Sequence, residues 1–380
     1  MRMSGSPVTR LRMALRVPRS LLVLALPSAS IASARSAAQT VARLRMALRV
    51  PRSLLVLALP SASIVFASAR SAAQTLTVRL DTTAHEMVME MSPITMHRMV
   101  EAQPGTITIP FDGWLQGYDC QLVDAHGKPL PHAFIHHVNL IAPEKRELFS
   151  PIMLRIGAQG SETPAVELPR ILGLRVHRGD TLLVTAMFQN AGAHDIVGAR
   201  LLIRMPYRAS GAVSAVSIYP MYLDVMPPAV AKSYDLPAGH SEKSWEGHPA
   251  VSGRILALGA HMHKYGTALR FEDITAKKVL WETKPIVDKT GEPVDMPVKT
   301  FWWSLGLPVR PDHVYRVTAI YDNPTGRTIP MGGMGTLGGV FMPSNVDAWP
   351  HVDRSAPDYV LDLKDTMSTE DMAGMAGMDH

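Results

Sequence analysis

The segment "RGDTLLVTAMFQNAG", residues 178–192, resembles a second segment, "PDHVYRVTAIYDNPTG", residues 311–326. This internal repeat, called the echo below, indicates the fold. Both share Val-Thr-Ala-x-aromatic-x-Asn, at 184–190 and at 317–323. Short β-branched and apolar runs bounded by Gly, Pro, Asp and Asn are typical of strands. Such runs recur from about 76 to 348 without long helical periodicity. We therefore predict an all-β protein with two tandem antiparallel β-sandwich, jelly-roll-like domains.

The echo also divides the chain. Each copy follows a histidine-bearing segment, "HAFIHHVNLI" at 132–141 and "GAHMHKYG" at 259–266. We predict an N-terminal domain over 76–210 and a C-terminal domain over 211–348. From 349 the strand pattern is lost, and the chain ends in "DTMSTEDMAGMAGMDH". This end is predicted to be a flexible Met-rich tail, which either captures cuprous copper or is an ordinary polar tail.

Residues 1–73 are predicted to be a duplicated targeting segment. They contain 11 arginines, no lysine and no acidic residue, and "RLRMALRVPRSLLVLALPSASI" occurs at 10–31 and again at 43–64. A basic start, a short apolar run and small residues before Gln74 are typical of a secretory signal. Pro60 interrupts the apolar run, which argues against a stable membrane anchor. We expect export to the periplasm or the extracellular space.

Charge and cysteine content exclude several classes of protein. Without residues 1–73 the chain has 27 basic and 33 acidic residues, a net charge of −6, so no nucleic-acid partner is expected. Cys120 is the only cysteine, so neither an internal disulfide nor a Cys-rich metal site can form. We expect Cys120 to be a small buried core residue.

The histidine segments contain candidate metal ligands. On a strand, His261 and His263 share one face and Met262 points away, as in a metal site or as two solvated polar side chains. "YDNPTGRTIPMGGMGTLGGVFMP", 321–343, offers a third ligand in one of its methionines, at 331, 334 and 342. Two imidazoles and a thioether stabilise Cu(I), although most methionines simply fill cores.

In the first half, His136 and His137 are adjacent. On a regular strand they face opposite ways. Binding of one ion then requires a bend or ligation through different ring nitrogens. The alternative is one buried and one exposed histidine.

Three motifs, "HHVNLI", "HMHKYG" and "GMGTLGGVF", resemble the copper type II, ascorbate-dependent monooxygenases, the family of peptidylglycine α-hydroxylating monooxygenase and dopamine β-hydroxylase. The resemblance covers roughly 100–345. It implies two tandem β-sandwich domains with one copper ion each. The first site of the family uses a His-His pair and a later histidine, and the second uses His-x-His and a later methionine. At the first site the implied ligands are His136, His137 and Met187, which replaces the third histidine, or the site is incomplete; at the second site they are His261, His263 and Met334.

The resemblance implies a secreted copper-dependent monooxygenase that hydroxylates a C–H bond of a small substrate with O₂ and a reductant such as ascorbate. Catalysis is expected at His261, His263 and Met334, with electrons supplied from the first site. Gly259 and Gly338 replace the arginine and tyrosine that anchor a peptide carboxylate in the peptide-amidating enzymes, so a peptidylglycine substrate is not expected. The family's disulfides are absent as well.

Two other functions stay open. One is a non-enzymatic copper-binding protein for storage or delivery, favoured by the Met-rich tail, by "HEMVMEMSPITMHRM" at 85–99 and by Met187. The other is a β-sandwich interaction module with vestigial metal sites.

Overall fold

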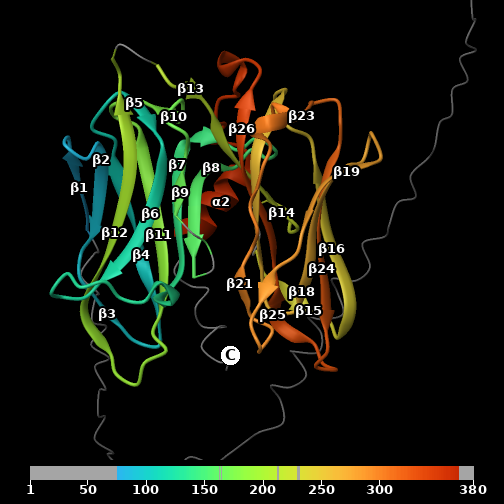
Figure 1. Ribbon diagram of the computed structural model, residues 1–380, viewed down its shortest axis with the longest axis horizontal. Coiled ribbons are helices and arrows are strands. Elements are labelled where there is room, and N and C mark those ends of the chain that lie inside the picture. Colours follow the sequence, from blue (N-terminus) through green and yellow to red (C-terminus); the bar gives the residue numbers. More distant parts are fainter. Residues whose placement is uncertain (1–74, 162, 164, 212–213, 229–231, 368–380) are drawn as a thin grey trace, which may run out of the picture. The chain divides into compact units, whose positions relative to one another are not determined.

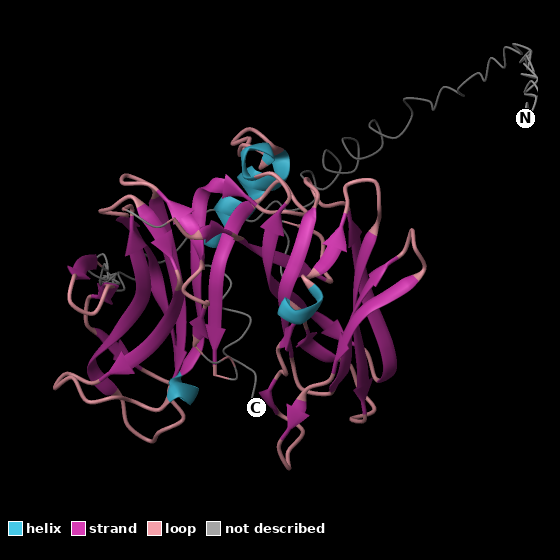
Figure 2. Cartoon of the chain, turned by 45° about the horizontal axis from the view of Figure 1, so that its top comes forward, coloured by secondary structure: helices cyan, strands magenta, loops and turns pink. Residues whose placement is uncertain are grey.

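The computed structural model describes residues 75–161, 163, 165–211, 214–228 and 232–367, all within one compact unit (Figures 1 and 2). The predicted targeting segment and the methionines beyond Met367 lie outside the described residues. Strands dominate what is described, as Figure 2 shows. The predicted all-β, antiparallel sandwich fold is confirmed.

Two sheets form the first sandwich within the described residues. The larger contains β1 (Leu76–Asp81), β2 (Glu86–Met91), β3 (Ile94–Met96), β5 (Gly113–Leu115), β6 (Gly117–Val123), β9 (Val166–Glu167), β10 (Leu172–Val176), β12 (Ile196–Ala209) and β13 (Val216–Ser217). The smaller has the order β4 (Met99–Thr108), β11 (Thr181–Gln189), β7 (Ile135–Arg146) and β8 (Met153–Gly160). Because β13 pairs with β10, the first sandwich extends past the predicted boundary at 210.

The second sandwich also has two main sheets in the described part of the chain. One contains β14 (Tyr219–Asp224), β26 (Gly335–Pro343), β17 (Gly253–Met262), β22 (Lys299–Thr300) and β23 (Leu307–Val309); the other has the order β16 (Gly239–Gly247), β24 (Tyr315–Asn323), β18 (Gly266–Asp273) and β19 (Lys278–Thr283). Two further two-stranded sheets pair β15 (Tyr234–Leu236) with β25 (Ile329–Gly333) and β20 (Ile286–Val287) with β21 (Pro293–Asp295). Short 3₁₀ turns are η1 (His132–Phe134), η2 (Trp302–Ser304) and η3 (Val346–Ala348).

Alternation of side chains builds the cores. In β12, buried and half-buried residues alternate almost without interruption, as expected for a strand with one core-facing side. On its outer side, Arg200 and Arg204 pair with Glu90 and Glu86 of β2. One large hydrophobic cluster lies within each sandwich.

Four of the five methionines at 85–99 belong to this first core. Met87, Met89, Met91 and Met96 are at most 1% exposed and belong to the first hydrophobic cluster. Cys120 lies in the same cluster, as predicted, and burial raises the pKa of its thiol. A run that resembles a copper-binding tract in composition is therefore a core element.

The echoed segments occupy matching positions. β11 is an inner strand between β4 and β7, and β24 is an inner strand between β16 and β18 (Figure 1). Their terminal asparagines are both buried: the Asn190 side chain donates to the backbone carbonyls of Met96 and His194, and the Asn323 side chain to those of Pro237 and Arg327. The shared Asn thus ties the end of each strand to neighbouring loops.

The prediction of a flexible tail from 349 is wrong for the part of that segment that the structure describes. Residues Pro357–Met367 form helix α2. Its Asp362 is 1% exposed and accepts two hydrogen bonds from the Arg155 guanidinium of β8, at 2.5 and 2.6 Å. Tyr359 donates to the carbonyl of Pro143 at 3.0 Å and packs in a third hydrophobic cluster with Ile141. The buried ion pair fixes a helix that composition alone did not reveal.

Candidate metal centres

The second candidate centre starts at the end of β17. Met262 is 1% exposed and belongs to the core of the second sandwich, so its neighbours His261 and His263 point away from that core. Both imidazoles are half-buried, and their ring centres lie 5.4 Å apart with the ring planes at 86°. An ion about 2.0 Å from one nitrogen of each ring fits between two rings at this separation.

Met334 lies directly beside this pair. β17 pairs with β26 so that His261 faces Thr336 and Met262 faces Gly335. β17 ends at Met262 and β26 begins at Gly335, so His263 and Met334 are the residues that directly follow and precede the paired strands. Continuation of the pairing by one residue puts Met334 opposite His263, on the face of the two histidines.

A buried hydroxyl group joins His263 to Met334. The Tyr321 hydroxyl accepts hydrogen bonds from the backbone N–H groups of His263 and Met334, both at 3.0 Å. It donates to the backbone carbonyl of Met334. Burial raises the pKa of Tyr321 to about 12, so the hydroxyl keeps its proton at neutral pH. The backbone positions of two candidate ligands are therefore held by one side chain from the opposite sheet.

The two other candidate methionines lie elsewhere. Met342 is eight residues further along β26, roughly 26 Å at about 3.3 Å per residue, and packs against the first core. Met331 lies in β25 with a φ of 51°, and its N–H donates to the Asp235 carboxylate at 3.0 Å. Of the three, Met334 is the one that the backbone brings beside the histidine pair.

A buried carboxylate lies one strand further from His261. Asp224 of β14 faces Thr336, which in turn faces His261. The Asp224 carboxylate accepts hydrogen bonds from the Thr336 hydroxyl at 2.8 Å and from the Tyr222 hydroxyl at 2.9 Å. Burial raises the pKa of this carboxyl group, and the nearby Lys232 ammonium counteracts that shift. Thr336, the direct neighbour of His261, is thus fixed in one orientation.

The two glycines that replace the family's peptide-anchoring residues face each other. Gly259 of β17 pairs with Gly338 of β26, two residues from the His261–Thr336 pair and on the same face. A Cβ atom at Gly338 has no heavy atom within 4 Å, and one at Gly259 comes only within 3.4 Å of a Val298 methyl group. These two positions therefore add no side chain to the strand surface beside the centre, whereas Tyr222 of β14 lies opposite Gly338 on the same face.

In the first sandwich, a β-bulge explains how the adjacent residues His136 and His137 lie on one face of β7. Met187 pairs with His137, but the next residue, Phe188, pairs with Ile135, so His136 is an extra residue in β7. Ile135 and Val138 both face the first core, which regular alternation forbids for residues three apart. The bulge thus leaves both histidines on the outer face. Neither is fully buried or fully exposed, and their ring centres lie 5.4 Å apart.

Met187 lies opposite this pair, on the neighbouring strand. Ala186 and Phe188 belong to the first core, so Met187 points to the face of the histidines. It is 6% exposed, yet it is not among the side chains of the three hydrophobic clusters in the described residues. Met187 is therefore buried on the outer face of its sheet, away from the first hydrophobic cluster.

The two candidate centres are not equivalent in the fold. His137 lies on the sheet that contains the echo strand β11, whereas His261 lies on the sheet opposite β24. Phe188, the counterpart of Tyr321 in the echo, has no hydroxyl group. The role of Tyr321 was missed from the sequence, although this Phe-to-Tyr difference between the echoed strands was visible there.

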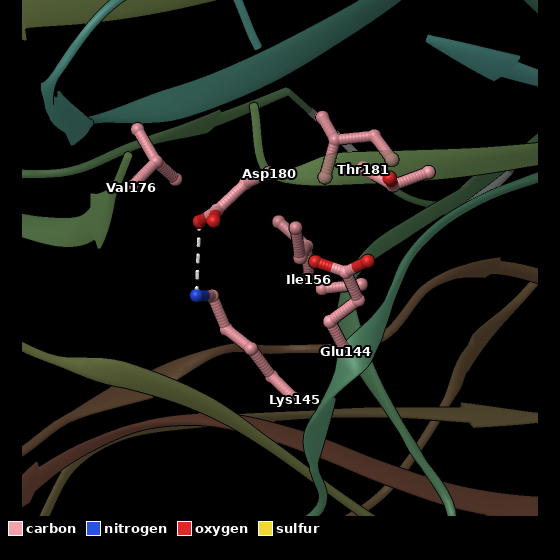
Figure 3. Close-up of a pocket in the computed structure, with 8 residues that line it drawn as sticks. Glu144, Lys145, Ile156, Val176, Asp180 and Thr181 are labelled. Atoms are coloured by element: carbon pink, nitrogen blue, oxygen red, sulfur yellow. Dashed lines mark hydrogen bonds and ion pairs between the residues drawn. The ribbon is translucent and has the colours of Figure 1, made fainter. Parts of the chain in front are cut away.

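Other features do not add to the centres. The pocket in Figure 3 contains the Lys145–Asp180 ion pair, at 3.0 Å, beside Thr181. Thr181 is six residues, roughly 20 Å, from Met187 along β11. In the described residues, no group of three or more His, Cys, Asp or Glu side chains is arranged to hold a metal ion. Nor does the described part of the chain contain a helix long and apolar enough to span a membrane.

Comparison with known proteins gives no family for this chain: no family model and no curated protein matches it. Among solved structures, the chain is similar to a protein of Parabacteroides distasonis ATCC 8503 that is thought to be secreted. The identity is 10%, the match covers 70% of this chain and 92% of the other, and the TM-score is 0.18.

Proposed function

We propose that the protein is an exported copper-dependent monooxygenase that hydroxylates a C–H bond of a small substrate with O₂ and a reductant such as ascorbate. The arrangement of His261, His263 and Met334 carries the proposal. Two half-buried imidazoles share one face with a thioether, and one hydroxyl group holds the backbone of two of these residues. This donor set fits copper in both oxidation states and lacks the thiolates or carboxylates that usually hold zinc.

In this proposal His261, His263 and Met334 hold the catalytic copper ion, and His136, His137 and Met187 hold an electron-supplying one. Bound copper supplies activation of O₂ and removal of hydrogen from the substrate. Tyr321 keeps His263 and Met334 at a fixed separation. Gly259 and Gly338 leave room for substrate beside the centre and place no arginine or tyrosine at these two positions, which favours substrates without a terminal carboxylate.

The storage or delivery alternative loses part of its support. The methionines of β2 and β3 that favoured it are buried in the first core. Their thioethers cannot collect copper from solvent in the folded protein. The Met-rich end beyond Met367, which also favoured it, lies outside the described residues.

Oxygen consumption tests the proposed activity. Mature protein, expected to begin near Gln74, is loaded with copper and supplied with ascorbate and a panel of small C–H substrates. Met334→Ile should abolish turnover, while the matched control Met342→Ile, near the far end of β26 and away from the histidines, should retain it. His137→Ala should retain copper at the second centre and lose coupled turnover. Stoichiometric copper binding without ascorbate-dependent O₂ uptake contradicts the proposal and supports storage or delivery.

A further inference from the structure

A fourth strand adds an apolar side chain to the row that contains Gly259 and Gly338. β22 pairs with β17 on the side away from β26, and Val298 directly precedes β22. A Cβ atom at Gly259 comes within 3.4 Å of a methyl group of Val298. Because Gly259 and His261 are two residues apart on one strand, they share a face. The Val298 side chain therefore lies over Gly259 on the face of His261, about 7 Å along the strand.

The backbone around Val298 is fixed, although its side chain is 59% exposed. Met296 is 5% exposed and belongs to the second core. The Thr283 hydroxyl donates to the backbone carbonyl of Pro297 at 3.3 Å, and Thr300 pairs with β17. Val298 thus presents its methyl groups at a defined place beside the centre.

The hairpin that precedes Val298 lies beside the same centre. Lys264, the residue after His263, pairs with Glu292 in the turn between β20 and β21 at 2.8 Å. The two strands of this hairpin contain three further apolar side chains that are about half exposed: Ile286, Val287 and Val294. Exposed apolar side chains that gather in one place, rather than singly, mark binding sites.

The two rows next to the row of His261 consist of uncharged residues. They cross β14, β26, β17 and β22, and their members are Tyr222, Gly338, Gly259 and Val298 in one row and Pro220, Val340, Ala257 and Thr300 in the next. A hydrocarbon group gains free energy when it is buried on such a surface. A charged group loses its hydration there without gaining a partner.

Two charged groups near these rows are already engaged. The Arg155 guanidinium lies over the Tyr222 ring, 5.7 Å from the ring centre, and pairs with Asp362 at 2.5 Å. The Asp224 carboxylate accepts hydrogen bonds from the hydroxyl groups of Tyr222 and Thr336. Their interactions within the protein leave the surface suited to an uncharged ligand.

We propose that the substrate of the second centre is an uncharged molecule with an aliphatic or aromatic hydrocarbon group, and that Val298 contacts this group. The inference rests on the proposed function and names the class of substrate. Since Val298 lies about two residues along the strand from His261, one small molecule can contact Val298 and hold a C–H bond at the centre. In the reaction, one oxygen atom of O₂ enters that bond and the other leaves as water, and ascorbate supplies two electrons and two protons.

Three probes that share a phenyl ring and differ in charge test the substrate class: ethylbenzene is uncharged, benzylamine is a cation and benzoate is an anion. Their affinities for copper-free mature protein and for its Val298→Ala and Val298→Asp variants are measured by ligand-observed magnetic resonance titration. Val279→Asp is the matched control, because Val279 of β19 is 51% exposed but lies on the other main sheet of the second sandwich. Thermal unfolding verifies that each variant is folded.

Ethylbenzene should bind the native protein more tightly than either charged probe. Val298→Ala should weaken ethylbenzene binding about fourfold, the value of one buried CH₂ group. Val298→Asp should weaken it at least about tenfold, because the carboxylate must give up water, and should strengthen benzylamine binding about threefold, as for an exposed ion pair. Val279→Asp should change none of these affinities. Equal ethylbenzene affinity in Val298→Asp and in the native protein refutes the apolar substrate class.

Oxygen consumption by the copper-loaded protein separates this inference from the proposed function. Ascorbate-dependent hydroxylation of benzylamine or benzoate in preference to ethylbenzene refutes the substrate class, while the monooxygenase function survives. Ethylbenzene binding that depends on Val298, without ascorbate-dependent hydroxylation of any probe, contradicts the monooxygenase function, while the apolar binding surface survives.

Discussion

Replacement of Tyr321 by Phe removes one oxygen atom from the link between His263 and Met334. Three hydrogen bonds are lost, and two backbone N–H groups lose their acceptor in a buried region. A net hydrogen bond is worth about 1 kcal/mol and an unsatisfied buried group costs about 1–3 kcal/mol, so the variant should lose about 2–4 kcal/mol of unfolding free energy. Because His263 and Met334 are then free to separate, Cu(I) affinity at the second centre should fall about tenfold.

Urea unfolding and Cu(I) competition titration measure the two effects. The matched control is Tyr315→Phe on the same strand: Tyr315 is 1% exposed, and its hydroxyl accepts the backbone N–H of Arg310 at 3.0 Å. This control should lose about 1 kcal/mol and keep its copper affinity. Equal copper affinity in Tyr321→Phe and in the native protein, with the stability loss present, refutes the positioning role of the hydroxyl.

Three further outcomes follow from contacts elsewhere in the fold. A Cβ atom at Gly259 comes within 3.4 Å of Val298, so the Gly259→Arg variant should fold normally. It should gain affinity for the carboxylate of an N-acylglycine in equilibrium titration, and unchanged affinity contradicts an open surface beside Gly259. Burial raises the pKa of the Glu147 carboxyl group from 4.5 to about 8. The contribution of this group to the free energy of unfolding is therefore complete below about pH 4.5 and is lost as pH rises through about 8. The urea midpoint of Glu147→Gln should therefore fall less than that of the native protein between pH 5 and pH 8, and parallel curves contradict this. Asp362→Asn leaves the 14%-exposed Arg155 side chain without its carboxylate and should cost about 3–5 kcal/mol in urea unfolding; a loss below about 1 kcal/mol would show that α2 is held by apolar contacts.

The features of the fold that depend on local residue patterns could be predicted from the sequence. Turn residues around β-branched runs predicted strands and the sandwich fold, and the Val-Thr-Ala echo predicted that β11 and β24 occupy matching places. Strand alternation accounts for Met187 pointing away from Ala186 and Phe188, which both lie in the core.

Features that depend on long-range pairing were not readable. Whether His136 and His137 share a face depends on a bulge, and a bulge is a property of two paired strands. The hydroxyl of Tyr321 reaches residues on the opposite sheet. Helix α2 is short, and it depends on the ion pair between Asp362 and Arg155, more than two hundred residues apart.

Composition misled where one residue type serves two purposes. The methionines of β2 have the spacing and density of a copper-binding tract, but they fill the first core. Met187 and Met334 look no different in the sequence. Only their position beside histidines, away from the hydrophobic clusters, separates them from the others.

X-ray absorption of the reduced, copper-loaded mature protein tests the central claim most directly, because it distinguishes nitrogen from sulfur ligands. We expect two copper ions per chain, each with imidazole nitrogens and one sulfur neighbour. Sulfur scattering should fall by about half in Met334→Ile and disappear when Met187→Leu is added, and it should not change in Met342→Ile. Two bound copper ions with no sulfur neighbour, or with sulfur scattering unchanged in the double variant, would contradict the thioether-ligated centres.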